Sequence, residues 1–161
     1  MPDDAIPQEK LDAICALITG VVSGMGIEVS VSVEENARYY IFNIASPDAK
    51  LLIGERGANL LALQTLVQNA AARKFGVTQR FALDVDGYKR QREWALRETA
   101  KAAMARVRQT GRPVALEPMQ AYERRIVHAY LSEDKDFDTE SVGSEPRRRV
   151  VVKLREKGDL F

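Results

Sequence analysis

The stretch Gly54–Gly57, with the sequence Gly-Glu-Arg-Gly, is the first candidate site, because glycine-rich loops bind phosphate through open backbone amides. A nucleoside triphosphate loop needs six residues from glycine to glycine and then Lys with Ser or Thr, whereas Ala58 and Asn59 follow this loop. A dinucleotide fingerprint needs three glycines on a strand-to-helix turn, whereas a helix is expected before Gly54. The spacing and the flanking residues therefore exclude both nucleotide loops.

Two interpretations of the Gly54–Gly57 loop remain: a plain helix–helix turn, and a contact with a nucleic-acid backbone. In the second case the glycines allow close approach, and the following helix offers free amides and a partial positive charge. Arg56 would attract phosphate, but the neighbouring Glu55 would cancel much of that attraction. The loop is therefore predicted to bind nucleic acid weakly or to bind a different partner.

The second candidate site combines Arg124 with His128, the only histidine in the chain. They are four residues apart, so on a helix they share one face. No Ser-His or Cys-His pattern supports a catalytic base, and a zinc site lacks companion ligands because the chain has one Cys. A guanidinium beside an imidazole can donate to phosphate, which predicts a phosphate clamp; the alternative is a packed or solvated helical histidine.

More cations surround this second site. Arg125 adjoins it, and a run of three arginines enters a predicted strand about twenty residues later: Arg147, Arg148 and Arg149. Such a run either protects an edge strand by its charge or adds phosphate contacts. The residues of the Gly54–Gly57 loop and of this second site are all predicted to contact nucleic acid.

The charge is distributed unevenly along the chain, although its formal net value is only +1. Residues 1–86 carry 7 Lys and Arg against 11 Asp and Glu, whereas residues 87–161 carry 17 against 12. This asymmetry favours a polyanionic partner for the C-terminal half.

Hydrophobic periodicity predicts the elements that must position these residues. Apolar residues at helical spacing indicate helices, and alternating apolar and polar residues indicate strands. The predicted elements of the first half are a helix over 11–22, strands over 27–33 and 38–45 joined by a turn at 34–37, a short helix starting at Ser46 and Pro47, a helix over 58–75, and a strand over 80–87 with Phe81, Leu83 and Val85 on one face.

The second half is predicted to begin with a long helix in which Trp94, Ala102 and Val107 are packing points. Glycine and proline end that helix and mark a domain boundary. The predicted elements are a helix over 88–109 ended by Gly111 and Pro113, an extended segment over 113–118, a helix over 121–131, and strands over 137–142 and 149–154.

Composition limits the remaining function classes. The chain has 161 residues, 45% of them apolar, which suffices for a packed core. The single cysteine, Cys15, excludes an internal disulfide and is expected to be a buried small hydrophobe. The uncharged run over 13–27 is short for a membrane span, and the acidic leader is unlike a secretory signal. We therefore expect a soluble, cytoplasmic protein that does not insert into membranes.

One segment has the spacing of a calcium loop. Asp134, Asp136 and Asp138 are followed by Glu145 at the twelfth position, but Thr139 stands where such a loop requires glycine. An acidic hairpin tip is the better interpretation. No metal, other cofactor or small-molecule substrate is predicted.

The two candidate sites carry a family resemblance. Helix-strand-strand-helix-loop-helix-strand is the order of a type II KH domain, and LLIGERGANLLALQTLVQ at 51–68 closely resembles the KH signature, although such loops commonly hold basic residues where Glu55 stands. EPMQAYERRIVHAYL and TESVGSEPRRRVVV are similar to the R-three-H domain, which is named for its Arg-xxx-His motif and binds single-stranded nucleic acids; Arg124 and His128 match that motif. A KH domain followed by this domain is the hallmark of the bacterial Jag family of SpoIIIJ-associated, KhpB-like proteins, and the similarity covers residues 10–155.

The resemblance implies an α+β fold with a type II KH domain over 1–86, a linking helix over 87–110 and a small α/β R-three-H domain over 111–161. It also implies non-enzymatic binding of single-stranded RNA, or of single-stranded DNA, in post-transcriptional regulation linked to the cell envelope or growth. The alternative is a protein-interaction adaptor whose KH fold forms a homodimer or docks to envelope or ribosomal partners.

Many members of the Jag family carry a separate N-terminal Jag domain. The ten residues before the first predicted helix leave no room for it, so functions of that domain are not expected here.

Overall fold

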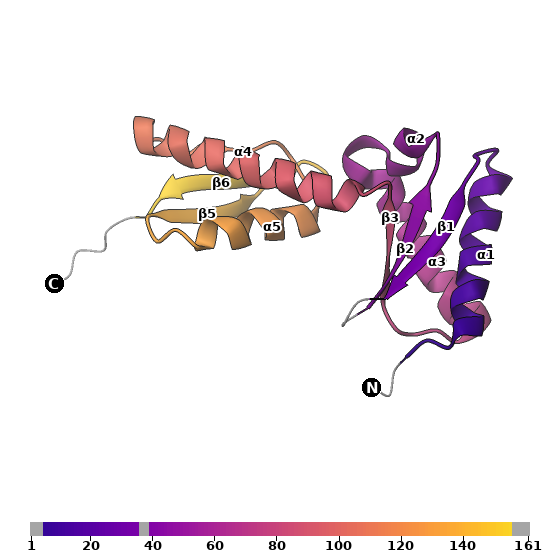
Figure 1. Cartoon of the computed structure of the whole chain (residues 1–161). Coiled ribbons are helices and arrows are strands. Elements are labelled where there is room, and N and C mark those ends of the chain that lie inside the picture. Colours follow the sequence, from indigo (N-terminus) through magenta and orange to yellow (C-terminus); the bar gives the residue numbers. More distant parts are fainter. Residues whose placement is uncertain (1–4, 36–38, 156–161) are drawn as a thin grey trace. The chain divides into compact units, whose positions relative to one another are not determined.

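The computed structural model describes residues 5–35 and 39–155, and Figure 1 shows the course of the chain. The chain divides into two compact units, Met1–Lys89 and Arg90–Phe161. Each unit has its own hydrophobic core and its own three-stranded sheet. The predicted α+β fold is confirmed.

The first unit has the predicted order of elements, and its bounds agree closely with the expected ones. Strand β1 begins three residues late. The predicted helix start at Ser46 and Pro47 was wrong, because α2 begins at Ala49 with Asp48 as its N-cap residue, and the Ser46 hydroxyl instead accepts a hydrogen bond from the Asp48 backbone N–H at 3.2 Å in a local turn. The predicted turn at 34–37 lies largely outside the described residues. The elements are α1 (Gln8–Gly24), β1 (Ser30–Glu35), β2 (Tyr40–Ala45), α2 (Ala49–Ile53), the short 3-10 turn η1 (Glu55–Gly57), α3 (Ala58–Phe75) and β3 (Phe81–Val85).

The sheet of the first unit has β2 at its centre, antiparallel to β1 and parallel to β3. Helices α1 and α3 pack on one face of this sheet (Figure 1). Ile14 and Ile18 of α1 and Val67 of α3 are fully buried with the strand residues Phe42 and Leu83. Burial along β3 alternates as predicted, so this strand presents one apolar face to the core.

The outer edge of β3 is covered by two glutamine side chains of α3. Gln64 donates from Nε2 to the Phe81 carbonyl and accepts at Oε1 from the Leu83 amide, both at 2.7 Å. One turn later, Gln68 donates to the Gln79 carbonyl at 3.0 Å and accepts from the Phe81 amide at 3.4 Å. Each side-chain amide takes the place of a peptide group from a neighbouring strand, so this edge is paired without another strand.

The second unit is a small antiparallel sheet in the order β4-β6-β5, with α4 and α5 beside it (Figure 1). The bounds of both long strands are those predicted from the sequence. The elements are α4 (Tyr88–Thr110), β4 (Val114–Ala115), α5 (Ala121–Ser132), β5 (Phe137–Val142) and β6 (Arg149–Leu154).

The packing face of α4 differs from the predicted one. Val107 is buried as expected, but Trp94 is 67% exposed and Ala102 is also exposed, so these two predictions were wrong. The prediction favoured the largest apolar side chain, whereas this helix approaches its neighbours through smaller residues that repeat at helical spacing. The buried residues of α4 are Leu96, Ala100, Ala103 and Val107.

Helix α4 is also more than the separate linker that the sequence suggests over 87–110. From Arg90 onward it belongs to the second compact unit, because its buried face shares a core with Val127, Phe137 and Val152. The second unit thus begins about one helix before the boundary that Gly111 suggests.

The segment that has calcium-loop spacing is a strand in the structure. Strand β5 runs through it, and Asp138 in that strand pairs with Arg155 at 2.9 Å.

The single cysteine, Cys15, is half-buried, and burial raises the pKa of its thiol. Within the described ranges, every helix is too short or too polar to cross a bilayer.

Replacing Gln64 with Ala should lower the free energy of unfolding of the first unit by about 1 kcal/mol, because two backbone groups of β3 lose their partner. Gln68→Ala is the matched control and should cost less, since its bond from the Phe81 amide is long at 3.4 Å. Residue-resolved hydrogen exchange checks the assignment: the Leu83 amide should lose protection in Gln64→Ala only. Unchanged protection of Leu83 in both variants would contradict it.

Candidate nucleic-acid interface

The Gly54–Gly57 loop has a backbone path that only glycine fits at its two ends. Gly54 and Gly57 have φ values of 72° and 79°. A Cβ atom on Gly54 would lie 2.5 Å from Asn59 Cγ, and one on Gly57 would lie 2.9 Å from the Tyr88 ring. Asn59 is itself held in place, since its amide donates to the Leu51 carbonyl at 2.8 Å. The glycines are therefore required by contacts within the unit.

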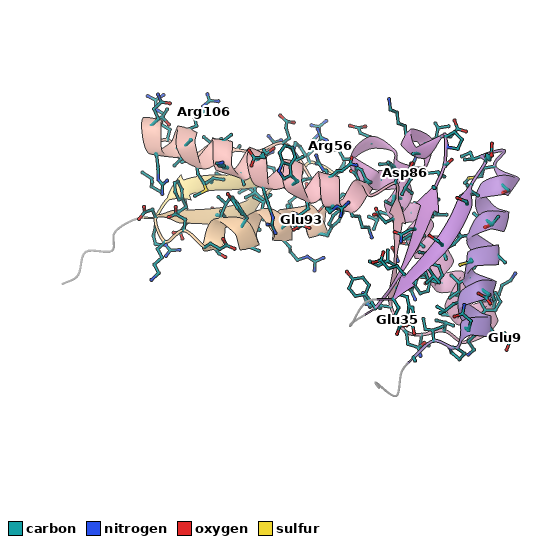
Figure 2. All side chains as sticks on the ribbon, in the orientation of Figure 1. Glu9, Glu35, Arg56, Asp86, Glu93 and Arg106 are labelled. Atoms are coloured by element: carbon teal, nitrogen blue, oxygen red, sulfur yellow. The ribbon has the colours of Figure 1, made fainter. Side chains whose placement is uncertain are left out.

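The two residues between these glycines both face solvent. The loop lies between α2 and α3, as the sequence predicts, and ends where α3 begins at Ala58. Glu55 and Arg56 are exposed, and the Arg56 backbone is left-handed with φ 51° (Arg56 is labelled in Figure 2). The loop thus presents one carboxylate and one guanidinium side by side at the start of a long helix.

Arg124 is buried rather than open to solvent. Its Nη1 donates to the Met119 carbonyl at 2.7 Å, and its Nη2 lies 2.8 Å from Glu145 Oε1. The Arg124 side chain is only 9% exposed, whereas the Glu145 side chain is 58% exposed. Arg124 therefore joins the start of α5 to the turn between β5 and β6, and a carboxylate occupies its outer nitrogen.

His128 lies on the same side of α5 as Arg124 and contacts β5. Its Nδ1 is 2.6 Å from the Thr139 hydroxyl oxygen. Partial burial lowers the pKa of His128 below its ordinary value, and the nearby Arg124 charge lowers it further. Both effects favour the neutral imidazole, which offers one donor and one acceptor.

The other predicted arginines are placed differently. Arg147 and Arg148 are exposed on the β5–β6 turn, where Arg148 Nε donates to the Ser141 hydroxyl at 2.9 Å. This turn is the one that Arg124 holds through Glu145, so the structure brings these arginines near the Arg124 side of α5. Arg149 alternates with the buried Val150, which places it on the opposite face of the sheet.

Arg125 follows Arg124 by one residue and therefore points about 100° away around the helix, where it is exposed. It does not share the face of Arg124 and His128.

A buried acid that the sequence analysis did not single out positions the whole of α5. Glu123 is fully buried; its Oε1 accepts from Arg92 Nε at 2.6 Å, and its Oε2 accepts from the Gln120 amide at 2.8 Å. Gln120 and Glu123 have the spacing of a capping box, but glutamine is not a usual N-cap residue, so the sequence signal was weak. Glu145 was missed as a partner of Arg124, since the two are distant in sequence.

Comparison with known families defines the class of protein. Residues 12–85 match the family described as the KH domain of KhpA and KhpB, and residues 95–154 match the R-three-H domain. The first match contains the Gly54–Gly57 loop, and the second contains Arg124 and His128. The chain is thus a KH domain followed by an R-three-H domain.

Curated relatives define the family more closely. The chain is 38% identical over 131 residues to a protein of Clostridium symbiosum, 33% identical over 151 residues to one of Lactiplantibacillus plantarum, and 31% identical over 151 residues to one of Bacillus subtilis. Each relative is named RNA-binding protein KhpB. These alignments cover 81%, 94% and 92% of this chain. The chain belongs to the KhpB family.

The relatives are longer than this chain. The aligned regions cover 59%, 47% and 70% of the three relatives, so the chain corresponds to about half to two-thirds of their length.

Lowering the pH below 6.5, the ordinary pKa of histidine, should reduce the free energy of unfolding through His128. The unfolded chain takes up a proton near that pH, whereas the folded chain does so only at lower pH, so stability is retained above 6.5 and is lost as the pH falls. NMR titration of the single imidazole should give a pKa below 6.5.

Two variants control this prediction. Arg124→Gln should raise the pKa of His128 part of the way toward 6.5, because it removes the neighbouring charge but leaves the burial. His128→Gln should remove the contribution of this group to the pH dependence of unfolding. A wild-type pKa at or above 6.5 would contradict the assignment.

Proposed function

We propose that this chain binds single-stranded RNA, without catalysing a reaction, through both of its domains. The observation that carries the proposal is that this member of the KhpB family has two candidate sites. A loop with two sterically required glycines occurs together with an Arg-xxx-His pair that adjoins an arginine-bearing turn. Relatives of the chain are named RNA-binding proteins, which supports RNA as the ligand.

In the KH domain, the RNA backbone would pass over the Gly54–Gly57 loop, whose path the two glycines make possible and where the start of α3 offers free amides. The bases would then enter a groove between α3 and β3 that is lined by residues including Leu61, Gln64, Gln68, Arg80 and Phe81. Because glutamine side chains cover the β3 edge, a base in this groove would meet side-chain amides before it met the strand backbone.

In the R-three-H domain, an RNA phosphate would take the place of Glu145 on Arg124. The Glu145 side chain is mostly exposed and can move away, whereas the Met119 carbonyl keeps the guanidinium oriented. Arg147 and Arg148 on the adjoining turn would add phosphate contacts. His128 would contribute a hydrogen bond as a neutral ring. Arg125 and Arg149 would be peripheral contacts.

When both sites of the chain bind the same RNA strand, the overall affinity rises without new contacts, because the second binding event becomes intramolecular. This arrangement suits a cytoplasmic regulator that acts on transcripts after their synthesis, and we propose a link to envelope or growth functions from the family resemblance alone.

A second candidate function is a protein-docking role for the KH domain. Leu51, Leu61 and Leu66 are exposed on α2 and α3, and Glu55 weakens the attraction of the loop for RNA. Nuclease treatment of a pull-down separates the two functions: it releases partners that are tethered by RNA and leaves partners that are bound to protein.

Replacing both Glu55 and Arg56 with Asp should weaken binding of a labelled single-stranded RNA by about tenfold, because two carboxylates would then face the phosphates. The matched control is the Glu9→Asp, Lys10→Asp pair, which makes the same charge change on α1 (Glu9 is labelled in Figure 2). Fluorescence anisotropy measures both. Equal affinity of the two double variants would show that the loop is only a turn.

Replacing Glu145 with Gln should strengthen RNA binding by about fivefold, since it removes a carboxylate that competes with phosphate for Arg124. Arg124→Gln should weaken binding and should reduce the log–log slope of affinity against salt by about 0.7, the value for one phosphate contact on a single strand. Glu140→Gln, on the opposite face of the sheet, is the control and should change neither quantity.

Circular dichroism must show that the Glu145→Gln and Arg124→Gln variants are folded. If Glu145→Gln then binds as the wild type does and Arg124→Gln keeps the wild-type salt slope, Arg124 only supports the turn.

A further inference from the structure

The exposed Trp94 is not explained by the packing of the second unit. It is the only tryptophan in the chain, and 67% of it faces solvent. At 3.6 residues per turn, its direction on α4 differs by about 160° from that of Leu96, which lies in the core. A tryptophan contributes a large flat apolar surface, and its exposure on α4 leaves that surface open to a ligand.

Trp94 lies within a row of cations on α4. Arg90, Arg97 and Lys101 stand at positions i−4, i+3 and i+7 relative to Trp94, which places all four on one face of the helix. All four side chains are exposed. From Arg90 to Lys101 this face extends about 16 Å along the helix axis. We name these four residues the α4 stripe.

The cations of the α4 stripe are available for a ligand. Among the side chains that the structure describes, none forms an ion pair with Arg90 or Lys101. Arg97 pairs with Glu93 at 2.7 Å, but both partners are exposed, and such a pair adds little stability (Glu93 is labelled in Figure 2). Glu98 stands beside the stripe at i+4 from Trp94, and with Glu93 it confines the positive charge to a narrow band.

An aromatic face within a row of cations has the chemistry that recognises single-stranded nucleic acid. Unpaired bases stack on the aromatic ring, and the cations neutralise the phosphates on either side. The phosphates of a duplex could also contact the cations, but its bases are already stacked on one another and cannot stack on the ring.

We propose that the α4 stripe is an additional binding site for single-stranded RNA, in which Trp94 stacks on one base and Arg90, Arg97 and Lys101 contact the neighbouring phosphates. This inference rests on the proposed function. It adds to that function a base-stacking contact that neither the Gly54–Gly57 loop nor the Arg-xxx-His pair supplies.

The experiment uses the full chain and a 12-nucleotide oligouridylate with a fluorescent end label. The emission of Trp94, the only indole, should be quenched as the RNA saturates, and the same oligonucleotide in a duplex should quench it much less. Trp94→Ala should weaken binding by about tenfold, within the range for loss of one stacked base, and Trp94→Phe should retain most of the affinity.

The charges are tested separately. Arg90→Gln combined with Lys101→Gln should lower the salt slope by about 1.4, which corresponds to two phosphate contacts. Arg106→Gln removes a cation about 120° away around the same helix, near its C-terminal end in Figure 2, and should leave the slope unchanged.

The outcomes distinguish this inference from the proposed function. If the labelled RNA does not bind the wild-type chain, the proposed function fails and this inference fails with it. If the wild type binds but its emission does not change and Trp94→Ala binds equally well, only the α4 stripe is overturned. Because Trp94 is exposed, its variants should unfold at the wild-type denaturant concentration.

Discussion

The buried carboxylate of Glu123 is the constraint on which the second unit depends. A charge without partners at a fully buried position would cost several kcal/mol, so the fold must supply donors to it. Arg92 on α4 and the backbone amide of Gln120 supply them. The start of α5 is thereby fixed against α4. Arg124 and His128 follow on the same helix, so one buried ion pair sets the direction of both motif residues.

The two domains expose different chemistry to a nucleic acid. The KH loop depends on the absence of side chains: Asn59 and Tyr88 leave no space for a Cβ atom at Gly54 or Gly57. The R-three-H domain instead depends on a charged side chain, Arg124, which forms an ion pair with Glu145 in the absence of a ligand. At the first site the glycines thus set the path of the loop backbone, whereas at the second site a phosphate must compete with the Glu145 carboxylate for Arg124.

The sequence predicted most of the fold because alternation and helical spacing report burial locally. The strands at 137–142 and 149–154 were recovered in this way, as were the Gly54–Gly57 loop and its flanking helices. The packing face of α4 was not recovered. Apart from Val107, which was predicted, its buried residues are Leu96 and two alanines. The burial of an alanine depends on what lies opposite it, and Trp94 carried a stronger hydrophobic signal.

The candidate site was predicted in part for a similar reason. Arg124 and His128 share a face because they share a helix, which spacing alone establishes. The ion pair between Arg124 and Glu145 depends on where the β5–β6 turn lies relative to α5, and no local sequence pattern predicts that position. The sequence likewise does not distinguish Gln64 and Gln68 from other polar helix residues, because their hydrogen bonds to β3 form only in the folded unit.

Because Gln64 and Gln68 pair with β3, the two edges of the first sheet differ in how their backbone groups are covered. A strand from another chain that approached β3 would have to displace two side-chain amides before it could form a ladder. On the β1 side, Glu34 and Glu35 end the strand with charge, but within the described part of the chain no side-chain amides from α3 cover that edge. Addition of a strand at β3 is therefore opposed by both glutamines, and exposing the whole of that edge would require the loss of both side-chain amides.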